Sequence, residues 1–287
     1  METKFRAFQL DSEGSLFSYY KPHQYVLIEA RIPKGGLDLL KVDLEFHGKS
    51  RVDILHITSW DVDHCKYEDL VQILNHLRPN IIEIPSYLPD SDTGKLCRAT
   101  LIGYDDIHQQ YTPNIRVMSR DFISTLENAQ VRDTSNVVYH STYDNQNKND
   151  MSLIQLFRSE GFNVLSLGDC ESQDIANYLL RDVLVTSEVD ILILPHHGAD
   201  NGFLTGEFLD KVSPRIAVCS SNTGNQYEHP KANIRALLSS REIPLMTTKR
   251  GDVIVFHEKN ASKSRALNLI SDNEDKLPDT LFTPKRF

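Results

Sequence analysis

The stretch that decides the fold reads ILILPHHGADNG and covers residues 191–202. Its first four residues are apolar and are isoleucine or leucine, which is typical of a strand buried inside a sheet. A proline ends the run, and His196, His197 and Asp200 follow it. In open α/β sheets, loops at the carboxyl ends of strands aim side chains into a shared crevice. The stretch therefore favours a strand-end site over a solvated histidine pair in a loop.

Three further predicted strand ends carry side chains of the same kind. They are TSWDVDHC at 58–65, LSLGDC at 165–170 and NQYEHP at 225–230. Each has an ordinary alternative, since an aspartate-rich segment can cap a helix and Gly-Asp is a common turn dipeptide. Four such clusters would converge on one edge if their sheets share a direction. Carboxylate oxygens beside imidazole nitrogens suit zinc, manganese or iron, so the pattern outlines a dinuclear metal site.

Strand-like and helix-like segments alternate along most of the chain, which predicts an α/β fold. We expect residues 1–60 to be mostly β, opening the fold as an antiparallel meander. We assign 1–259 to one domain and 260–287 to a weakly patterned C-terminal extension. Strands are predicted at 26–32, 51–58, 80–84, 136–140, 152–157, 162–167, 190–194, 215–220 and 252–257, and helices at 67–77, 172–184 and 230–240.

Composition excludes several classes of protein. The 287 residues are 40% hydrophobic and 25% charged, which excludes a disordered or fibrous chain. The formal charge of −9 argues against a general nucleic-acid coat, although an acidic enzyme can still hold a small phosphate-binding cleft. Four scattered cysteines do not form a disulfide framework, and neither a secretory signal nor an apolar run of membrane-spanning length is visible. We therefore expect a cytoplasmic protein without a membrane partner.

The motifs together resemble a known family. In order and spacing, TSWDVDH, NDMSL, SLGDC, LPHHGAD and YEHP are similar to the motifs of the metallo-β-lactamase-fold hydrolases, and within them to the soluble nuclease-like domain of DNA-uptake competence proteins. The resemblance spans about residues 5–257. It implies an αββα sandwich, in which two facing mixed sheets are covered by outer helices and the metals lie at one edge between the halves.

The resemblance also implies the ligands. Asp63, His64 and Asp169, with one of His196 or His197, would hold the better-formed metal. The family's first histidine falls on Ser59, and its serine or threonine after HHG falls on Ala199. The first metal site is therefore expected to be weakened and to depend on Asp61 and His140. Two zinc ions are expected, with a single ion or manganese as alternatives.

The implied function is that of a metal-dependent hydrolase, a phosphodiesterase or nuclease that acts on nucleic acid or a nucleotide through a metal-bound hydroxide. Asp63 would accept the proton of the attacking water, and His229 would orient the substrate or protonate the leaving oxygen. Lys66, Lys231 and Arg235 adjoin the motifs, where they either meet substrate phosphate or are simply solvated.

Two other functions stay open. The fold also hosts hydrolysis of esters, thioesters and lactones. A chain with Ser59 in the first motif can alternatively be a degenerate enzyme that serves as a binding or assembly subunit with a protein partner in a larger system. His56 is expected to be an ordinary strand residue, and Trp60 is expected to pack against the motif loop rather than stack on a base.

Overall fold

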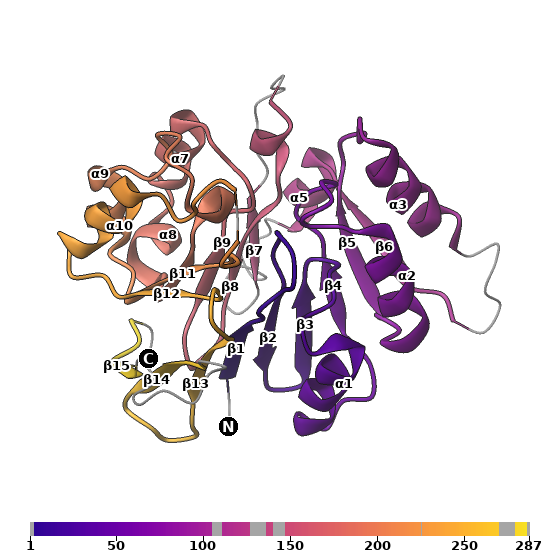
Figure 1. The fold of residues 1–287 in the computed structure, drawn as a ribbon, viewed down its shortest axis with the longest axis horizontal. Helices are drawn as coiled ribbons and strands as arrows, with labels where there is room; N and C mark the ends of the chain where they lie inside the picture. The colour runs from indigo at the N-terminus through magenta and orange to yellow at the C-terminus, as the bar shows by residue number, and fades with distance from the viewer. Residues whose placement is uncertain are drawn as a thin grey trace.

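Two β-sheets face each other and carry helices on their outer sides (Figure 1). The computed structural model describes residues 3–104, 111–126, 136–139, 147–224, 226–269 and 279–285. The larger sheet has nine strands in the order β15-β14-β13-β1-β2-β3-β4-β5-β6, and the smaller has six in the order β12-β11-β10-β9-β8-β7. This is the αββα sandwich that the sequence predicts.

The element bounds are as follows. The larger sheet contains β1 (Thr3–Ala7), β2 (Phe17–Lys21), β3 (Gln24–Ile28), β4 (Ile54–His56), β5 (Ile81–Pro85), β6 (Asn114–Met118), β13 (Val253–His257), β14 (Ser264–Asn268) and β15 (Asp279–Phe282). The smaller contains β7 (Val137–Tyr139), β8 (Ile154–Phe157), β9 (Val164–Ser166), β10 (Ile191–Ile193), β11 (Ile216–Cys219) and β12 (Leu245–Thr247). The helices are α1 (Gly36–Phe46), α2 (Tyr67–His76), α3 (Asp92–Ile102), α5 (Arg120–Leu126), α7 (Gln173–Leu179), α8 (Val183–Glu188), α9 (Gly206–Val212) and α10 (Ala232–Ser239), with 3₁₀ turns η1 (Asn149–Met151) and η2 (Pro195–Gly198).

Strand alternation builds the core between the sheets. In β10, Ile191 and Ile193 face the opposite sheet, whereas Leu192 packs under the outer helices. In β3, Val26 and Ile28 face inward in the same way. Both faces of each central strand are therefore apolar, which is why these strands read as continuous hydrophobic runs.

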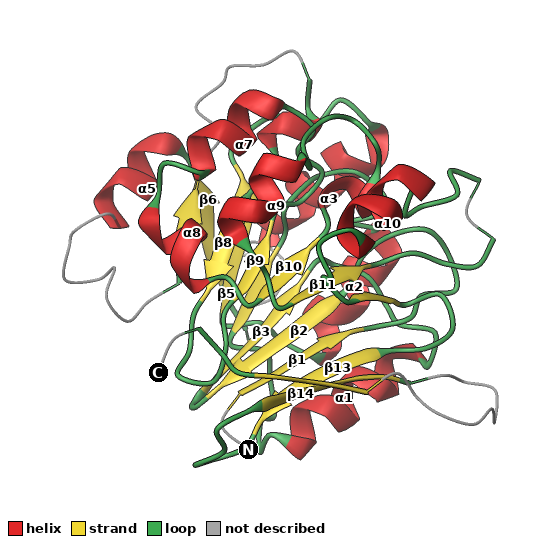
Figure 2. Cartoon of the chain, turned by 90° about the vertical axis from the view of Figure 1, so that its left-hand side faces the viewer, coloured by secondary structure: helices red, strands yellow, loops and turns green. Residues whose placement is uncertain are grey.

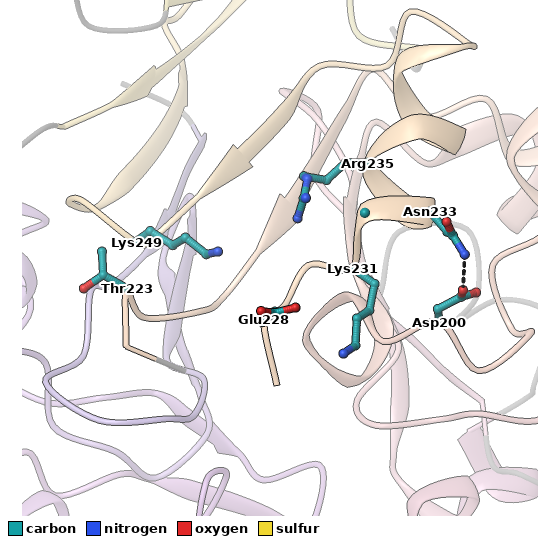
Figure 3. A pocket seen from close by; sticks show the side chains of 8 residues that line it. Asp200, Thr223, Glu228, Lys231, Asn233, Arg235 and Lys249 are labelled. Carbon is teal, nitrogen blue, oxygen red and sulfur yellow. Dashed lines mark hydrogen bonds between the residues drawn. The ribbon is translucent and has the colours of Figure 1, made fainter. Parts of the chain in front are cut away.

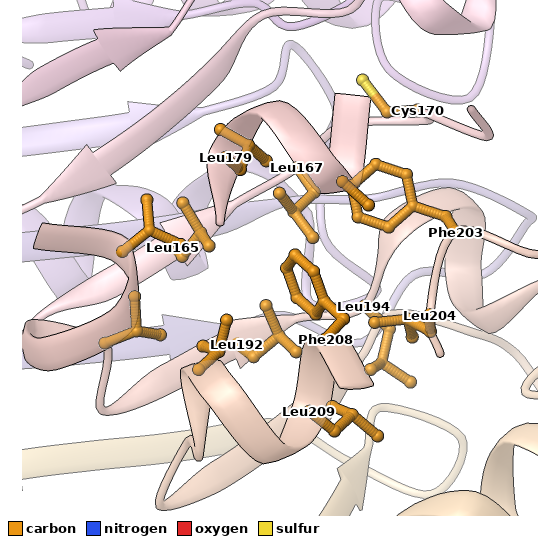
Figure 4. Packing of buried hydrophobic residues seen from close by; sticks show 14 of the residues in the cluster. Leu165, Leu167, Cys170, Leu179, Leu192, Leu194, Phe203, Leu204, Phe208 and Leu209 are labelled. Carbon is orange, nitrogen blue, oxygen red and sulfur yellow. The ribbon is translucent and has the colours of Figure 1, made fainter. Parts of the chain in front are cut away.

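Helices seal the outer face of each sheet (Figure 2). Buried leucines and isoleucines of α1 and α2 lie on the larger sheet, and those of α7 and α10 lie on the smaller. Figure 4 shows the second of these cores, where Phe203 and Phe208 lie between helices and strands. Their ring centroids are 5.5 Å apart in an edge-to-face arrangement.

We expect Phe208→Ala to lower the free energy of unfolding by about 3–5 kcal/mol, because a fully buried ring leaves a cavity in this core. Urea denaturation measures the change. Val42→Ala is the matched control, since Val42 lies on α1 and is 60% exposed, and it should alter stability by less than about 0.5 kcal/mol. Equal effects of the two substitutions would contradict this packing.

Some predicted elements differ in extent. Strands β1, β2 and β3 form the predicted antiparallel meander, but α1 occupies part of the stretch 1–60 that the sequence predicts to be mostly β. The predicted strand at 26–32 ends at Ile28 because Glu29 adopts a left-handed φ of 74°. The predicted helix at 172–184 is two helices, since the Asp182 side chain caps a new helix at Leu184. Beyond Asn260, the chain continues the larger sheet, with β14 antiparallel to β13 and β15 antiparallel to β14.

The strand ends that matter for function lie together. Strands β3 to β6 are parallel in one sheet, and β9 to β12 are parallel in the other. The polar motifs follow β4, β9, β10 and β11 at their carboxyl ends. Their side chains therefore meet at one edge of the sandwich.

Candidate metal centre

Four buried or half-buried side chains meet at this edge. Among the described residues, one group of histidines and carboxylates has the spacing of metal ligands, namely Asp63, His64, Asp169 and His197, whose donor atoms lie within 4.8 Å of one another. His64 Nε2 lies 2.8 Å from Asp169 Oδ2 and 3.8 Å from Asp63 Oδ2. His197 Nε2 lies 3.1 Å from Asp63 Oδ2 and 4.0 Å from Asp169 Oδ1. We call these four residues the donor cluster.

A sharp turn after β9 places Asp169. Gly168 adopts a φ of 54°, and a Cβ atom there would lie 2.6 Å from the Cβ atom of Ser152, so a larger residue does not fit. The Asp169 amide donates to the Ser152 hydroxyl at 3.2 Å. Asp150 accepts the amides of Glu171 and Ser172 a little further on. The NDMSL segment therefore positions the carboxylate of the SLGDC segment.

A left-handed turn after β10 decides which histidine of the pair joins the cluster. His196, His197 and Gly198 have φ values of 44°, 53° and 81°, which non-glycine residues adopt rarely. This turn directs His197 toward Asp63, and the His197 Nδ1 donates to the Ser220 carbonyl at 3.0 Å. The His196 ring instead lies 2.6 Å from Glu171. His197 is thus the member of the pair at the cluster.

A buried carboxylate orients His64 from behind. His64 Nδ1 lies 3.0 Å from Glu29 Oε1, and the same carboxylate accepts the amide of Thr58 at 3.0 Å and its hydroxyl at 2.5 Å. Glu29 thus holds Nδ1, and Nε2 is the ring nitrogen that faces the two cluster carboxylates. Metal-binding histidines are commonly held in this way by a carboxylate or carbonyl on the other ring nitrogen.

The loop that carries Asp63 is held by a buried arginine. The Arg31 guanidinium donates to the Asp63 carbonyl at 2.9 Å and to the Glu13 carbonyl at 2.7 Å, and it pairs with Asp69 at 3.3 Å. Arg31 is only 4% exposed, so these contacts fix the loop from inside.

The chemistry of the cluster fits a divalent cation. Burial opposes ionisation of Asp63 and Asp169, but His64 and His197 together outweigh it and keep the pKa of both carboxyls below the usual value. Burial likewise opposes a charged His64, yet Asp169, Asp63 and Glu29 raise its pKa well above normal. His64 Nε2 has no hydrogen-bond partner despite its 2.8 Å contact with Asp169. One divalent ion would balance two carboxylates with neutral imidazoles and engage that nitrogen.

The other residues predicted for metal binding lie elsewhere. Asp61 stays outside the donor cluster and accepts the Ser59 hydroxyl at 3.1 Å. Ser59, at the position of the family's first histidine, also contacts the Tyr87 hydroxyl at 3.0 Å. His140 lies outside the described residues. The described residues therefore supply donors for one well-formed site, and a second site at Asp61 stays a prediction.

A cavity of about 840 Å³ opens in front of the cluster. Asp63 and His197 line it, so these two cluster residues face the solvent side. Lys66 and Ser220 also line the wall, as does His229, whose ring stacks on His197 with centroids 6.4 Å apart and on Tyr227 at 5.6 Å. The cavity thus joins the cluster to an aromatic wall that ends at the exposed Tyr227.

His229 sits beside the cluster rather than in it. Burial, followed by the nearby His197 and His196 rings, lowers the pKa of His229 to about 4. Its imidazole is therefore neutral at pH 7, where it can accept one hydrogen bond and donate another. This favours the orienting role over that of an acid already protonated at neutral pH.

Several residues of the site were not anticipated from the sequence. Glu29 and Arg31 lie more than 25 residues before the motif they support, and Tyr227 precedes the expected His229. For Glu29 and Arg31 the one signal in the sequence is that they are two charged residues inside the apolar run at 26–32. His56 and Trp60 behave as expected, since His56 pairs with Glu83 at 2.9 Å and Trp60 is 1% exposed.

Comparison with known proteins supports the assignment of the αββα sandwich to a known class of fold. No family model matches the chain. The metallo hydrolase Igni18 from Ignicoccus hospitalis is similar with a TM-score of 0.51 at 13% identity, over 90% of this chain and 100% of that one. The metallo-beta-lactamase fold protein YhfI from Bacillus subtilis is similar with a TM-score of 0.50 at 10% identity, over 88% and 98%. The chain therefore has the metallo-β-lactamase fold.

Within that class, the sequence resembles competence proteins. It is 23% identical to ComE operon protein 3 of Bacillus subtilis over 214 residues, which cover 74% of this chain and 25% of that protein. It is 36% identical to Competence protein ComA of Neisseria gonorrhoeae over 66 residues, or 23% of this chain and 9% of that protein. The chain thus spans a quarter or less of these relatives. No helix in the described ranges is both long and apolar enough to cross a membrane.

Proposed function

We propose that this chain is a metal-dependent hydrolase that cleaves phosphodiester bonds in nucleic acid or a nucleotide. The observation that carries the proposal is the donor cluster, which lies behind a cavity at the strand-end edge of a metallo-β-lactamase fold. A divalent ion bound there would polarise a phosphoryl oxygen and lower the pKa of water. Asp63, His64, Asp169 and His197 would hold it, and zinc or manganese suits such a mixture of oxygen and nitrogen donors.

The other steps of the proposed reaction are assigned to side chains of the cluster and of the cavity wall. Asp63 is 28% exposed at its side chain and faces the cavity, so its carboxylate can take up a proton from an attacking water. His64 and Asp169 are buried behind it and would fix the geometry. His229 lies on the cavity wall and would orient the substrate by hydrogen bonding, while Lys66 on the same wall would attract its phosphate.

The phosphodiester substrate rests on the likeness of the motifs to the nuclease-like domain of competence proteins, together with a cationic residue in the cavity wall. The alternative of a binding subunit is favoured by one observation, namely that Ser59 bonds to Tyr87 in place of a metal-binding histidine. Turnover by the metal-loaded protein separates these candidates, because a binding subunit does not catalyse hydrolysis. A protein partner and a cytoplasmic location stay predictions.

A substrate panel tests the activity. The protein, freed of metal with a chelator and then supplied with zinc or manganese, is assayed on bis(p-nitrophenyl) phosphate, a single-stranded oligodeoxynucleotide and p-nitrophenyl acetate. We expect the protein to release p-nitrophenol from bis(p-nitrophenyl) phosphate and to cleave the oligodeoxynucleotide, in both cases only when the metal is present. Turnover of the acetate alone would favour the ester hydrolase, and turnover of none by metal-loaded protein would favour the scaffold.

We further expect Glu29→Gln to weaken metal binding about 10- to 100-fold, because loss of the carboxylate removes the partner that orients His64. Competition with a chromophoric chelator measures the affinity. Glu83→Gln is a matched control, since Glu83 pairs with His56 in the same way but away from the cluster. Similar metal affinities for the two variants would refute the role assigned to Glu29.

A further inference from the structure

A second cavity of about 500 Å³ lies next to the first and is lined by charged side chains. Lys231 and Arg235 reach it from the start of α10, and Lys249 reaches it from the loop after β12. Figure 3 shows the side chains of Arg235 and Lys249 directed toward the same space, with Glu228 beside it. Three cations from two separate segments therefore face one hollow.

The two cavities adjoin along three stretches of backbone. Ala199 lines the first cavity, and its neighbour Asp200 lines the second. Ser221 and Asn222 line the first, and Thr223 lines the second. Across residues 227–231, Tyr227 and His229 line the first cavity, and Glu228 and Lys231 line the second. The same three stretches of backbone thus supply wall residues to both cavities, which places the second cavity beside the first.

Two acids, Asp200 and Glu228, line the second cavity together with the three cations, but neither forms an ion pair with them. In the described part of the chain, no carboxylate lies within ion-pair distance of Lys231, Arg235 or Lys249, whereas Arg241 and Lys211, which lie outside this cavity wall, are paired with Asp210 and Glu207. One of the two acids in the wall, Asp200, accepts a hydrogen bond from Asn233 at 2.7 Å. The other, Glu228, is exposed at the rim. In a chain with a charge of −9, this concentration of cations without ion-pair partners favours an anionic ligand.

We propose that the second cavity is a phosphate subsite. In it, Lys231, Arg235 and Lys249 bind the phosphate that neighbours the scissile phosphodiester on the substrate strand. The proposal rests on the proposed function and narrows it, because a strand with several phosphates fills both cavities and a single phosphodiester fills only the first. Lysine and arginine bind phosphate through charge-assisted hydrogen bonds that do not depend on the base. Glu228 opposes the same anion and limits the affinity.

The test compares a long and a short substrate on one protein. For the double variant Lys231→Ala with Lys249→Ala, kcat/KM on a short single-stranded oligodeoxynucleotide, divided by kcat/KM on bis(p-nitrophenyl) phosphate, should fall at least about tenfold. Glu228→Gln should raise the same ratio. The matched control is Lys211→Ala, whose lysine is paired with Glu207 on α9 away from the cavity and which should leave the ratio as in the wild type. An unchanged ratio in the double variant overturns the subsite.

Binding separates this proposal from the proposed function. The fluorescence anisotropy of a labelled oligodeoxynucleotide is titrated with metal-loaded protein at several salt concentrations. Loss of this one phosphate contact should weaken binding and reduce the magnitude of the slope of log K against log salt by about 0.7. If the wild type cleaves neither substrate, the proposed function fails, and the same weakening would still support the subsite. Equal affinity and equal slope for the wild type and the double variant would overturn it in either case.

Discussion

Replacing Asp169 with alanine is expected to lower the affinity of the chain for a divalent ion by about 100- to 1000-fold. Binding energies of roughly 10–16 kcal/mol for four-ligand zinc sites correspond to about 2.5–4 kcal/mol for each ligand. Asp169 is 3% exposed, and its two oxygens face His64 and His197, so no other side chain can move into its place without rearranging the turn at Gly168. Isothermal titration with zinc or manganese measures the loss.

A buried aspartate outside the cluster provides the control. Asp43 is 2% exposed and pairs with Lys4 at 2.7 Å, away from the donor cluster. Asp43→Asn should destabilise the fold, because a buried ion pair loses one partner, yet it should leave the affinity for the metal as it is in the wild type. If Asp169→Ala binds the ion as tightly as Asp43→Asn does, the donor cluster is not the metal site.

The second large effect is expected at His229. His229→Ala should reduce kcat on bis(p-nitrophenyl) phosphate by about 10²- to 10³-fold, the usual cost of removing one positioned hydrogen-bond donor from the reacting group. The metal content should stay that of the wild type, because the His229 ring lies beside His197 without belonging to the donor cluster. Steady-state kinetics and elemental analysis on the same preparation test both parts.

Two outcomes would contradict that assignment. Loss of the metal in His229→Ala would show that His229 is a metal ligand. Full activity of this variant would show that His229 takes no part in the reaction. His229→Gln refines the test, since a glutamine can orient a substrate through its amide but cannot take up a proton at ordinary pH. Because burial and the neighbouring rings lower the pKa of His229 to about 4, we expect His229→Gln to recover part of the rate.

The sequence predicts the fold from features that are local and repeated. Apolar runs such as 190–194 mark the buried strands, and the polar residues that follow them mark the strand ends. Parallel strands bring such ends to one edge of a sheet, so the residue pattern predicts a shared site, and the resemblance to the family assigns Asp63, His64 and Asp169 to it. The order of the motifs adds the identity of the fold.

Other parts of the site depend on backbone conformation, which a residue pattern does not encode. The choice between His196 and His197 is made by a left-handed turn that directs the two rings apart. The support from Glu29 depends on a left-handed residue that ends β3, so the pattern at 26–32 instead predicted a continuing strand. The second cavity joins Lys231 to Lys249, which are separated by α10 and β12 along the chain.

Ser59 shows a third kind of limit. The sequence identifies that the family's first histidine is missing, but not what the replacement does. In the structure the Ser59 hydroxyl connects Asp61 to Tyr87, a residue that belongs to no motif. The strength of a second metal site therefore depends on contacts that only the folded chain brings together.

Elemental analysis is the direct test of whether Asp63, His64, Asp169 and His197 hold a divalent ion. The wild type and Asp63→Ala are purified side by side, exposed to zinc and manganese, and freed of unbound metal by gel filtration. We expect at least one equivalent of ion per wild-type chain and a clear loss in the variant. A wild-type chain that retains no metal after this treatment would contradict the assignment of these four residues as ligands.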